Sequence, residues 1–207
     1  LGITRLGGFY RLAYFLPYAV PGVVGTIMWG FIFEPQFGPF VQISHWLGGG
    51  APAFLNPGGI LPTIGFISIW QTAGFNIIIL FTALRNVPHD LTEAAVVDGA
   101  TLFRIMLQIK VPMVRGAITL SGFLGIIGTL QLFTEPYVLS SFTSSINTTY
   151  TPNMYIYSSA FGAQDFNYAA AISFVLGIVT VGAAVLVLLV RRKRRPDSAN
   201  VGAEAVA

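Results

Sequence analysis

Residues 60–84 read ILPTIGFISIWQTAGFNIIILFTAL, a run without a single charged side chain. A helix of about 20 apolar residues crosses the hydrocarbon core of a bilayer, so this run is long enough to span it. Three further uncharged runs of similar character are Leu12–Phe33, Gly116–Thr134 and Phe166–Val190. A buried helix of a soluble protein would explain one such run. Four of them in 207 residues predict an all-α, polytopic membrane helix bundle.

The composition agrees with a membrane protein. Hydrophobic residues make up 54% of the chain and charged residues only 9%, too few charges to cover a soluble domain of this size. The chain has no cysteine, which excludes disulfides and cysteine-based metal sites.

The cations predict the orientation. If the four runs cross alternately, all eleven Lys and Arg residues fall on one side, and the loops 34–59 and 135–165 contain none. Cytoplasmic loops carry the excess of Lys and Arg. The N-terminal residues, the loop 86–112 and the C-terminus are therefore expected in the cytoplasm. The excess of positive charge in the chain then reflects membrane topology and not nucleic-acid binding.

Two regions follow from this organisation. Residues 1–190 are predicted to form the transmembrane domain, with the loop 86–112 on its cytoplasmic side. Residues 191–207 begin with RRKRR, a basic anchor suited to anionic lipid headgroups, and continue as a small, polar, disordered tail.

Several local expectations concern the spans and outer loops. Pro17 and Pro21 predict a kinked first span, because proline interrupts helical hydrogen bonding. The loop 34–59 is expected to hold a short helix at the membrane surface with Trp46 at the interface. The segment 135–165 reads as a long, hydroxyl-rich loop. A glycine stripe in the third span predicts close packing of another helix; it consists of Gly122, Gly125 and Gly128.

Polar side chains at depth are candidates for a solute pathway. Asn76 lies near the middle of the second span, where an unpaired amide is costly. Thr129, Gln131 and Tyr137 follow one another near the outer end of the third span. These groups suit contacts with solute hydroxyls. Hydrogen bonds between helices are an equally open interpretation, above all for Asn76.

The cytoplasmic loop contains residues 93–112, EAAVVDGATLFRIMLQIKVP. Asp90 and Glu93 resemble a capping box for a short helix from Leu91 to about Val97. Gly99 is expected to end that helix with a left-handed cap, and Thr101 to cap a second short helix running to about Ile109. Pro112 fits the first turn of the third span.

The two-helix knob predicted here would present small and apolar side chains. Ala94 and Ala95 leave little bulk on the first helix, and Phe103 and Ile109 contribute to an apolar surface on the second. Such a knob suits insertion into a groove on a soluble partner. Packing of Phe103 and Ile109 against their own spans is the competing interpretation.

The pattern E-A-A, three residues, G, nine residues, I-x-V-P resembles the E-A-A loop of permease subunits of ATP-binding-cassette importers. Val111 stands where that family usually has Leu. The flanking segments FLPYAVP, FTEPYVL and YIYSSAF are similar to those of sugar permeases of the maltose and glycerol-phosphate type. One departure is Ser140-Ser141-Phe142, where members often have Gly-Gly-Pro. The resemblance covers roughly residues 5–190.

The resemblance implies a coupling role for the loop and a set of partners. The residues implied to couple to the ATPase are Glu93, Ala94, Ala95, Asp98, Gly99, Ala100, Phe103, Ile109 and Pro112. The implied partners are an ATPase subunit that binds ATP and magnesium, a second permease, an extracytoplasmic solute-binding protein, a sugar and the lipid bilayer of a prokaryotic plasma membrane. Members usually have six spans, so two would precede Leu1.

Catalysis by this chain is not expected. Its only lysines, Lys110 and Lys193, lie outside any glycine-rich phosphate loop. His45 and His89 are expected on opposite sides of the membrane, where they cannot share a metal. Two other functions stay open: a permease of the same superfamily for a polyamine or phosphate ester, and a stand-alone channel or scaffold. The uncharged spans favour a neutral polar solute.

Overall fold

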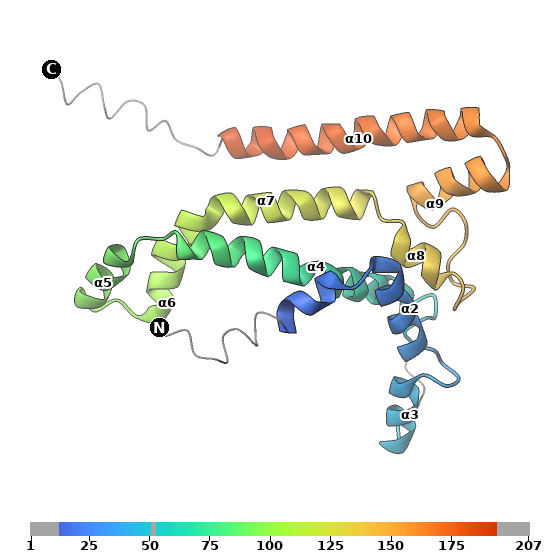
Figure 1. The fold of residues 1–207 in the computed structure, drawn as a ribbon, viewed down its shortest axis with the longest axis horizontal. Helices are drawn as coiled ribbons and strands as arrows, with labels where there is room; N and C mark the ends of the chain where they lie inside the picture. Colours follow the sequence, from blue (N-terminus) through green and yellow to red (C-terminus); the bar gives the residue numbers. More distant parts are fainter. Residues whose placement is uncertain (1–12, 51–52, 194–207) are drawn as a thin grey trace.

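The computed structural model describes residues 13–50 and 53–193, and every regular element in these residues is helical (Figure 1). A first helix covers Ala13–Ala19. The others are α2 (Gly22–Ile32), α3 (Pro39–Trp46), α4 (Ile60–Arg85), α5 (His89–Val97), α6 (Leu102–Ile105), the π-helical turn η1 (Met106–Lys110), α7 (Val111–Leu130), α8 (Thr134–Leu139), α9 (Pro152–Tyr157), the π-helical turn η2 (Ser158–Gly162) and α10 (Phe166–Lys193).

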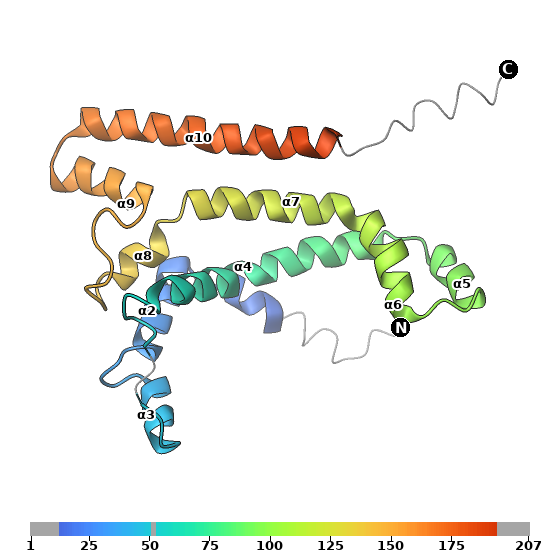
Figure 2. The ribbon, with the colours of Figure 1, turned by 180° about the vertical axis from the view of Figure 1, so that it is seen from behind.

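Three long helices form the body of the bundle. The stretches Ile60–Arg85, Leu102–Leu130 and Phe166–Val187 are each long and apolar enough to cross a membrane. They lie side by side, α7 between α4 and α10 (Figures 1 and 2). The short helices α5 and α6 lie at one end of the bundle, and α3, α8 and α9 lie at the other. The predicted all-α polytopic architecture is confirmed.

The first predicted span, Leu12–Phe33, is not one straight helix. The chain bends by 106° between Ala13–Ala19 and α2, so these two pieces make a fourth crossing only if the bent pair counts as one span. Pro21 explains the break, because its ring cannot donate a helical hydrogen bond and disfavours helical geometry in the residue before it. The predicted kink is confirmed, and it is larger than an ordinary proline kink. Leu12 lies outside the described residues.

A polar contact from α4 holds α2, the helix that follows the bend. The Gln71 side-chain amide donates to the Gly22 carbonyl at 3.1 Å and to the Thr26 hydroxyl at 3.2 Å. Thr26 is fully buried and itself donates to the Gly22 carbonyl at 2.8 Å. Gly25 leaves room for the approach, since a Cβ there would lie 3.1 Å from the Gln71 amide nitrogen. The amide therefore fixes α2 against the middle of α4.

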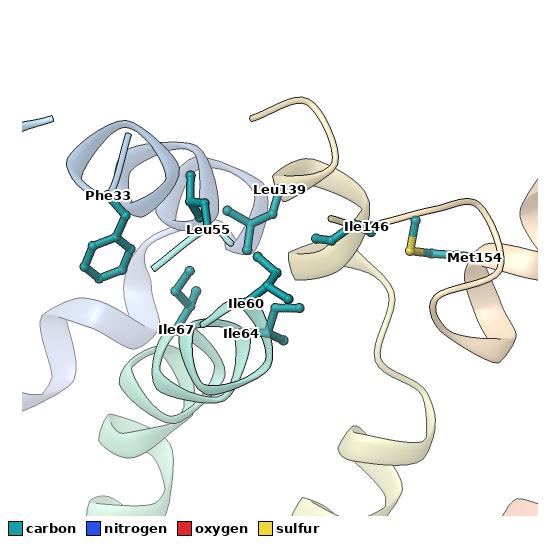
Figure 3. Packing of buried hydrophobic residues seen from close by; sticks show 8 residues of the cluster. All are labelled: Phe33, Leu55, Ile60, Ile64, Ile67, Leu139, Ile146 and Met154. Atoms are coloured by element: carbon teal, nitrogen blue, oxygen red, sulfur yellow. The ribbon is translucent and has the colours of Figure 1, made fainter. Parts of the chain in front are cut away.

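The main hydrophobic core lies at the α8–α9 end of the bundle (Figure 3). Its buried residues come from six different segments: Phe33, Leu55, Ile60, Ile64, Ile67, Leu139, Ile146 and Met154. Two hydroxyls hold the connecting loops together, because Thr143 and Ser145 both donate to the Leu55 carbonyl, at 2.7 and 2.9 Å. The segment 135–165 is thus folded into α8, α9 and η2 around this core. The predicted long loop between two spans is thus partly helical, with residues 140–151 irregular.

The loop 34–59 contains the predicted short helix as α3. Gly48, with φ +77°, continues the chain beyond the helix end in a left-handed conformation that glycine adopts without strain. Trp46 is exposed at the end of α3. Its location at the membrane interface stays a prediction.

The glycine stripe of α7 does not pack against another helix of this chain. A Cβ added at Gly122, Gly125 or Gly128 would meet no atom within 4 Å. The predicted close packing is therefore wrong for the described residues of this chain, and the stripe is an open surface.

Two glycines of α4 provide a matched test of this packing. A Cβ at Gly74 would lie 2.6 Å from the Tyr14 carbonyl oxygen, whereas a Cβ at Gly65 would meet nothing within 4 Å. We expect Gly74→Ala to destabilise the protein by about 1–3 kcal/mol through overpacking. Gly65→Ala should instead be neutral or stabilise by up to about 1 kcal/mol through helix propensity. Thermal unfolding in detergent compares the two, and equal melting temperatures would contradict the packing of Ala13–Ala19 on α4.

Candidate functional site

The knob begins at α5, which starts at His89, two residues before the Leu91 start that a capping box at Asp90 requires. Pro88 occupies the N-cap position and no side chain caps the helix. Asp90 therefore lies within the first turn, where its carboxylate faces the positive end of the helix dipole. The helix itself is as predicted, but the Asp90–Glu93 capping box is wrong because the fixed φ of Pro88 already starts the helix.

The turn between α5 and α6 is a Schellman motif at Gly99. Gly99 has φ +78°, and its N–H donates to the Val96 carbonyl at 3.0 Å. The Ala100 N–H donates to the Ala95 carbonyl at 2.9 Å. These two bonds satisfy carbonyls that the helix end would otherwise leave unpaired. The predicted left-handed cap is confirmed, and the motif explains why glycine stands at residue 99.

The second knob helix does not end near Ile109 as predicted. Thr101 caps α6 as expected, its hydroxyl accepting from the Arg104 N–H at 3.4 Å. The helix then continues through η1 directly into α7, with Pro112 in the first turn of α7 as expected. The knob is thus covalently continuous with a membrane-spanning helix, without a flexible joint.

The knob presents an apolar surface that no other part of the described chain covers. Val97, Leu102 and Phe103 are 86%, 79% and 74% exposed, whereas Ile105 is 2% exposed. Phe103 therefore does not pack against its own spans, while Ile109 is half-buried. Of the remaining motif residues, Ala95 and Ala100 are half-buried, and the exposed ones are Glu93, Ala94, Asp98, Gly99 and Pro112.

Charged side chains of both signs lie on the knob and on the helix ends next to it. Arg104 and Lys110 lie on α6 and η1, Arg85 ends α4, and Arg115 lies in the first turns of α7. The Arg104 guanidinium donates to the Gln108 side chain at 2.9 Å. The three acidic groups of the knob are on α5 and its turn, namely Asp90, Glu93 and Asp98. An exposed apolar patch with charged neighbours of both signs is typical of a protein-docking surface.

The second candidate set, Asn76, Thr129, Gln131 and Tyr137, is not assembled by hydrogen bonds among its members. Asn76 accepts a hydrogen bond from Ser121 of α7 and donates to the Thr72 carbonyl at 3.1 Å. Its role as a contact between helices is therefore observed. Thr129 donates to the Gly125 carbonyl at 2.9 Å, within its own helix.

Tyr137 belongs to a row of rings that the sequence did not reveal. We call this row the aromatic ladder; it consists of Phe133, Tyr137, Tyr157, Phe161 and Phe166. Ring centroids lie 5.0 Å apart for Phe133–Tyr137 and 5.1 Å apart for Tyr137–Tyr157. They lie 4.9 Å apart for Tyr157–Phe161.

The ladder offers both stacking faces and hydroxyl groups. All its members except Phe133 are exposed. A side-chain hydrogen bond with Tyr157 raises the pKa of Tyr137 above its ordinary value. The rings come from α8 and its N-cap residue and from α9, η2 and α10. The sequence shows only the four-residue spacing within two pairs, Phe133 with Tyr137 and Tyr157 with Phe161.

The part of the chain that the structure describes contains no group of three or more His, Cys, Asp or Glu residues that could hold a metal. His45 is at the end of α3 and His89 at the start of α5, at opposite ends of the molecule (Figure 1).

Relatives of known sequence include transport permeases. The chain is 32% identical over 200 residues to the diacetylchitobiose uptake system permease protein NgcF of Streptomyces coelicolor, covering 91% of this chain and 54% of NgcF. It is 29% identical over 185 residues to the sn-glycerol-3-phosphate transport system permease protein UgpA of Salmonella typhimurium, covering 86% of this chain and 61% of UgpA. The chain thus spans a little over half the length of these relatives.

Solved structures share the fold. A bacterial ABC transporter involved in the import of the acidic polysaccharide alginate superposes with a TM-score of 0.84 at 20% identity, covering 95% of this chain and 69% of that chain. A bacterial alginate ABC transporter in complex with an alginate pentasaccharide-bound periplasmic protein gives 0.80 at 21% identity, covering 89% and 65%.

A family model, that of the binding-protein-dependent transport system inner membrane component, matches residues 4–195, almost the whole chain. This match agrees with the helical bundle and with the knob between two of its spans. The chain therefore belongs to the family of inner membrane components of binding-protein-dependent transport systems.

Proposed function

We propose that this chain is part of the permease subunit of an ATP-driven importer for a sugar or related polyol. The observation that carries the proposal is the knob of α5 and α6. Its two helices are joined by a Schellman turn at Gly99, it exposes Val97, Leu102 and Phe103, and it continues directly into the span α7. A partner that binds this knob can therefore move α7 directly, because no flexible linker separates the knob from α7.

The partner that fits the knob is a soluble ATPase subunit at the cytoplasmic side. Binding and hydrolysis of ATP, with magnesium, belong to that subunit and not to this chain. The cations Arg85, Arg104, Lys110 and Arg115 all lie at the knob end of the bundle, which supports a cytoplasmic knob. The same rule places the end of α10 in the cytoplasm of a prokaryotic cell, because that end lies on the knob side (Figure 2).

Further partners follow from the uncovered surfaces. The glycine stripe of α7 and much of α10 are exposed, with Phe174, Ile178 and Leu186 among the exposed apolar side chains. In a membrane these surfaces must face lipid or other helices. A second permease subunit suits the glycine stripe, and lipid suits the remaining apolar surface. An extracytoplasmic solute-binding protein would dock at the opposite end from the knob.

The solute pathway is proposed to include the aromatic ladder. Aromatic rings stack on the apolar faces of sugars, and the hydroxyl of Tyr137 can bond to a sugar hydroxyl. The proposed pathway also includes Thr129, Gln131 and Asn76. Asn76 would exchange its hydrogen bond with Ser121 for one with the solute. The sugar-uptake relative supports a neutral substrate, and the glycerol-phosphate relative keeps a phosphate ester as the second candidate.

Changes at Gly99 test the coupling role. Gly99→Pro should abolish ATP-driven sugar uptake, because proline cannot adopt the positive φ of the Schellman turn. Gly99→Asn should keep part of the uptake, since asparagine tolerates this conformation. The measurement is uptake of labelled diacetylchitobiose by cells that contain the complete transporter, with membrane insertion followed by immunoblot. Full uptake by the inserted Gly99→Pro variant would refute the coupling role.

Changes at Tyr137 test the pathway. Tyr137→Ala should raise the half-saturating sugar concentration of uptake about tenfold, corresponding to about 1.4 kcal/mol of lost binding. Tyr168→Ala is the control, because Tyr168 is also exposed but pairs with Tyr155 outside the ladder. The ladder would have no place in the pathway if both variants gave the wild-type concentration dependence.

A further inference from the structure

The π-helical turn η1 joins the knob to the span α7. Over Met106–Lys110 the helix widens, and the Val111 N–H donates to the Met106 carbonyl five residues before it. The flanking residues Ile105 and Val111 keep ordinary helical dihedral angles, with φ −58° and ψ −45° and with φ −60° and ψ −46°. The turn is therefore a local widening within one continuous helix.

Pro112 provides a physical cause for this widening. In a regular α-helix the residue at position 112 would donate to the Gln108 carbonyl, and proline has no N–H for that bond. Its ring also clashes with that same carbonyl. A π turn immediately before the proline moves the Gln108 carbonyl out of its α-helical position, and such single turns occur mostly as bulges within α-helices.

The widened turn determines which face of α6 is exposed. One extra residue in a turn changes the rotation of everything before it by about 100° relative to a regular helix. With the turn present, Ile105 is buried and Phe103 is exposed, while Val114 is buried on the α7 side of the turn. A regular helix over the same residues would rotate Ile105 out of its buried position and Phe103 away from the docking surface.

We propose that Pro112 is a positioning residue, which imposes η1 and thereby sets the rotation of the knob surface relative to α7. The importance of this rotation for ATP-driven transport rests on the proposed function. The rotation itself does not, because it is a property of this chain alone. Labelling of cysteines can therefore test it without the ATPase.

The experiment uses single cysteines in a chain that naturally has none. Phe103→Cys and Ile105→Cys are made separately, and membranes of producing cells are treated with a water-soluble maleimide. Each cysteine is tested in the wild-type background, with Pro112→Ala, and with Pro112→Ala combined with deletion of Gln108. The deletion removes the extra residue, so the resulting α-helix has nearly the rotation that the π turn provides.

With the wild-type turn, we expect the Phe103→Cys variant to react with the maleimide and the Ile105→Cys variant to be protected. Pro112→Ala should make the cysteine at position 105 reactive, because the turn relaxes towards an α-helix and rotates the knob. Adding the Gln108 deletion should restore protection of that cysteine. Restoration also excludes general unfolding, since an unfolded knob would not regain a protected position when a residue is removed.

Three results would each overturn the proposal. They are a reactive cysteine at position 105 with the wild-type turn, a cysteine there that stays protected in Pro112→Ala, or no restoration of protection by the deletion. Capture of an ATPase subunit is measured separately on the same membranes. Failure to capture one while the labelling pattern holds would count against the proposed function and leave the role of Pro112 intact.

Discussion

Backbone groups inside a bilayer have no water to bond, and this constraint determines where the helices of the chain can break. The break at Pro21 is accompanied by the Gln71 amide, which bonds to the Gly22 carbonyl of the following helix. The interruption at Pro112 is absorbed by a π turn and not by a gap in the helix. At Gly99, in the knob beyond the spans, the chain reverses sharply, and there a Schellman motif satisfies the helix end.

The same constraint explains how a knob can act on a membrane helix. A soluble protein usually connects a docking element to its core through a loop. Here the second knob helix is the beginning of the 29-residue stretch Leu102–Leu130, so on the proposed function a displacement or rotation of the knob would be carried into the bilayer. At the other end, the buried cluster around Ile64 and Leu139 and the two hydroxyls on the Leu55 carbonyl hold α4 and α8 with their loops as one unit. The bundle between these ends has few buried side chains.

Features set by neighbouring residues could be predicted from the sequence, and features set by distant contacts could not. Uncharged runs located the long helices, and Gly99 and Thr101 predicted the turn and the cap, because each depends on a few adjacent residues. The bend of 106° depends on Pro21 together with α4, and the short helices within 135–165 depend on packing of Leu139 and Met154 against residues far away in the chain. The aromatic ladder could not be predicted from the sequence because its rings come from four separate elements. The Asp90 capping box failed because Pro88 starts the helix first.

A photo-cross-linking side chain at position 103 tests most directly whether the knob contacts an ATPase. The cross-linker is placed there in the complete permease within native membranes, and at position 46 on α3 as the control. We predict that position 103 forms an adduct with a subunit bearing a Gly-x-x-x-x-Gly-Lys-Ser/Thr loop, and that position 46 does not. Adducts at position 103 with lipid or with this chain alone, in membranes where a known importer gives its ATPase adduct, would contradict it.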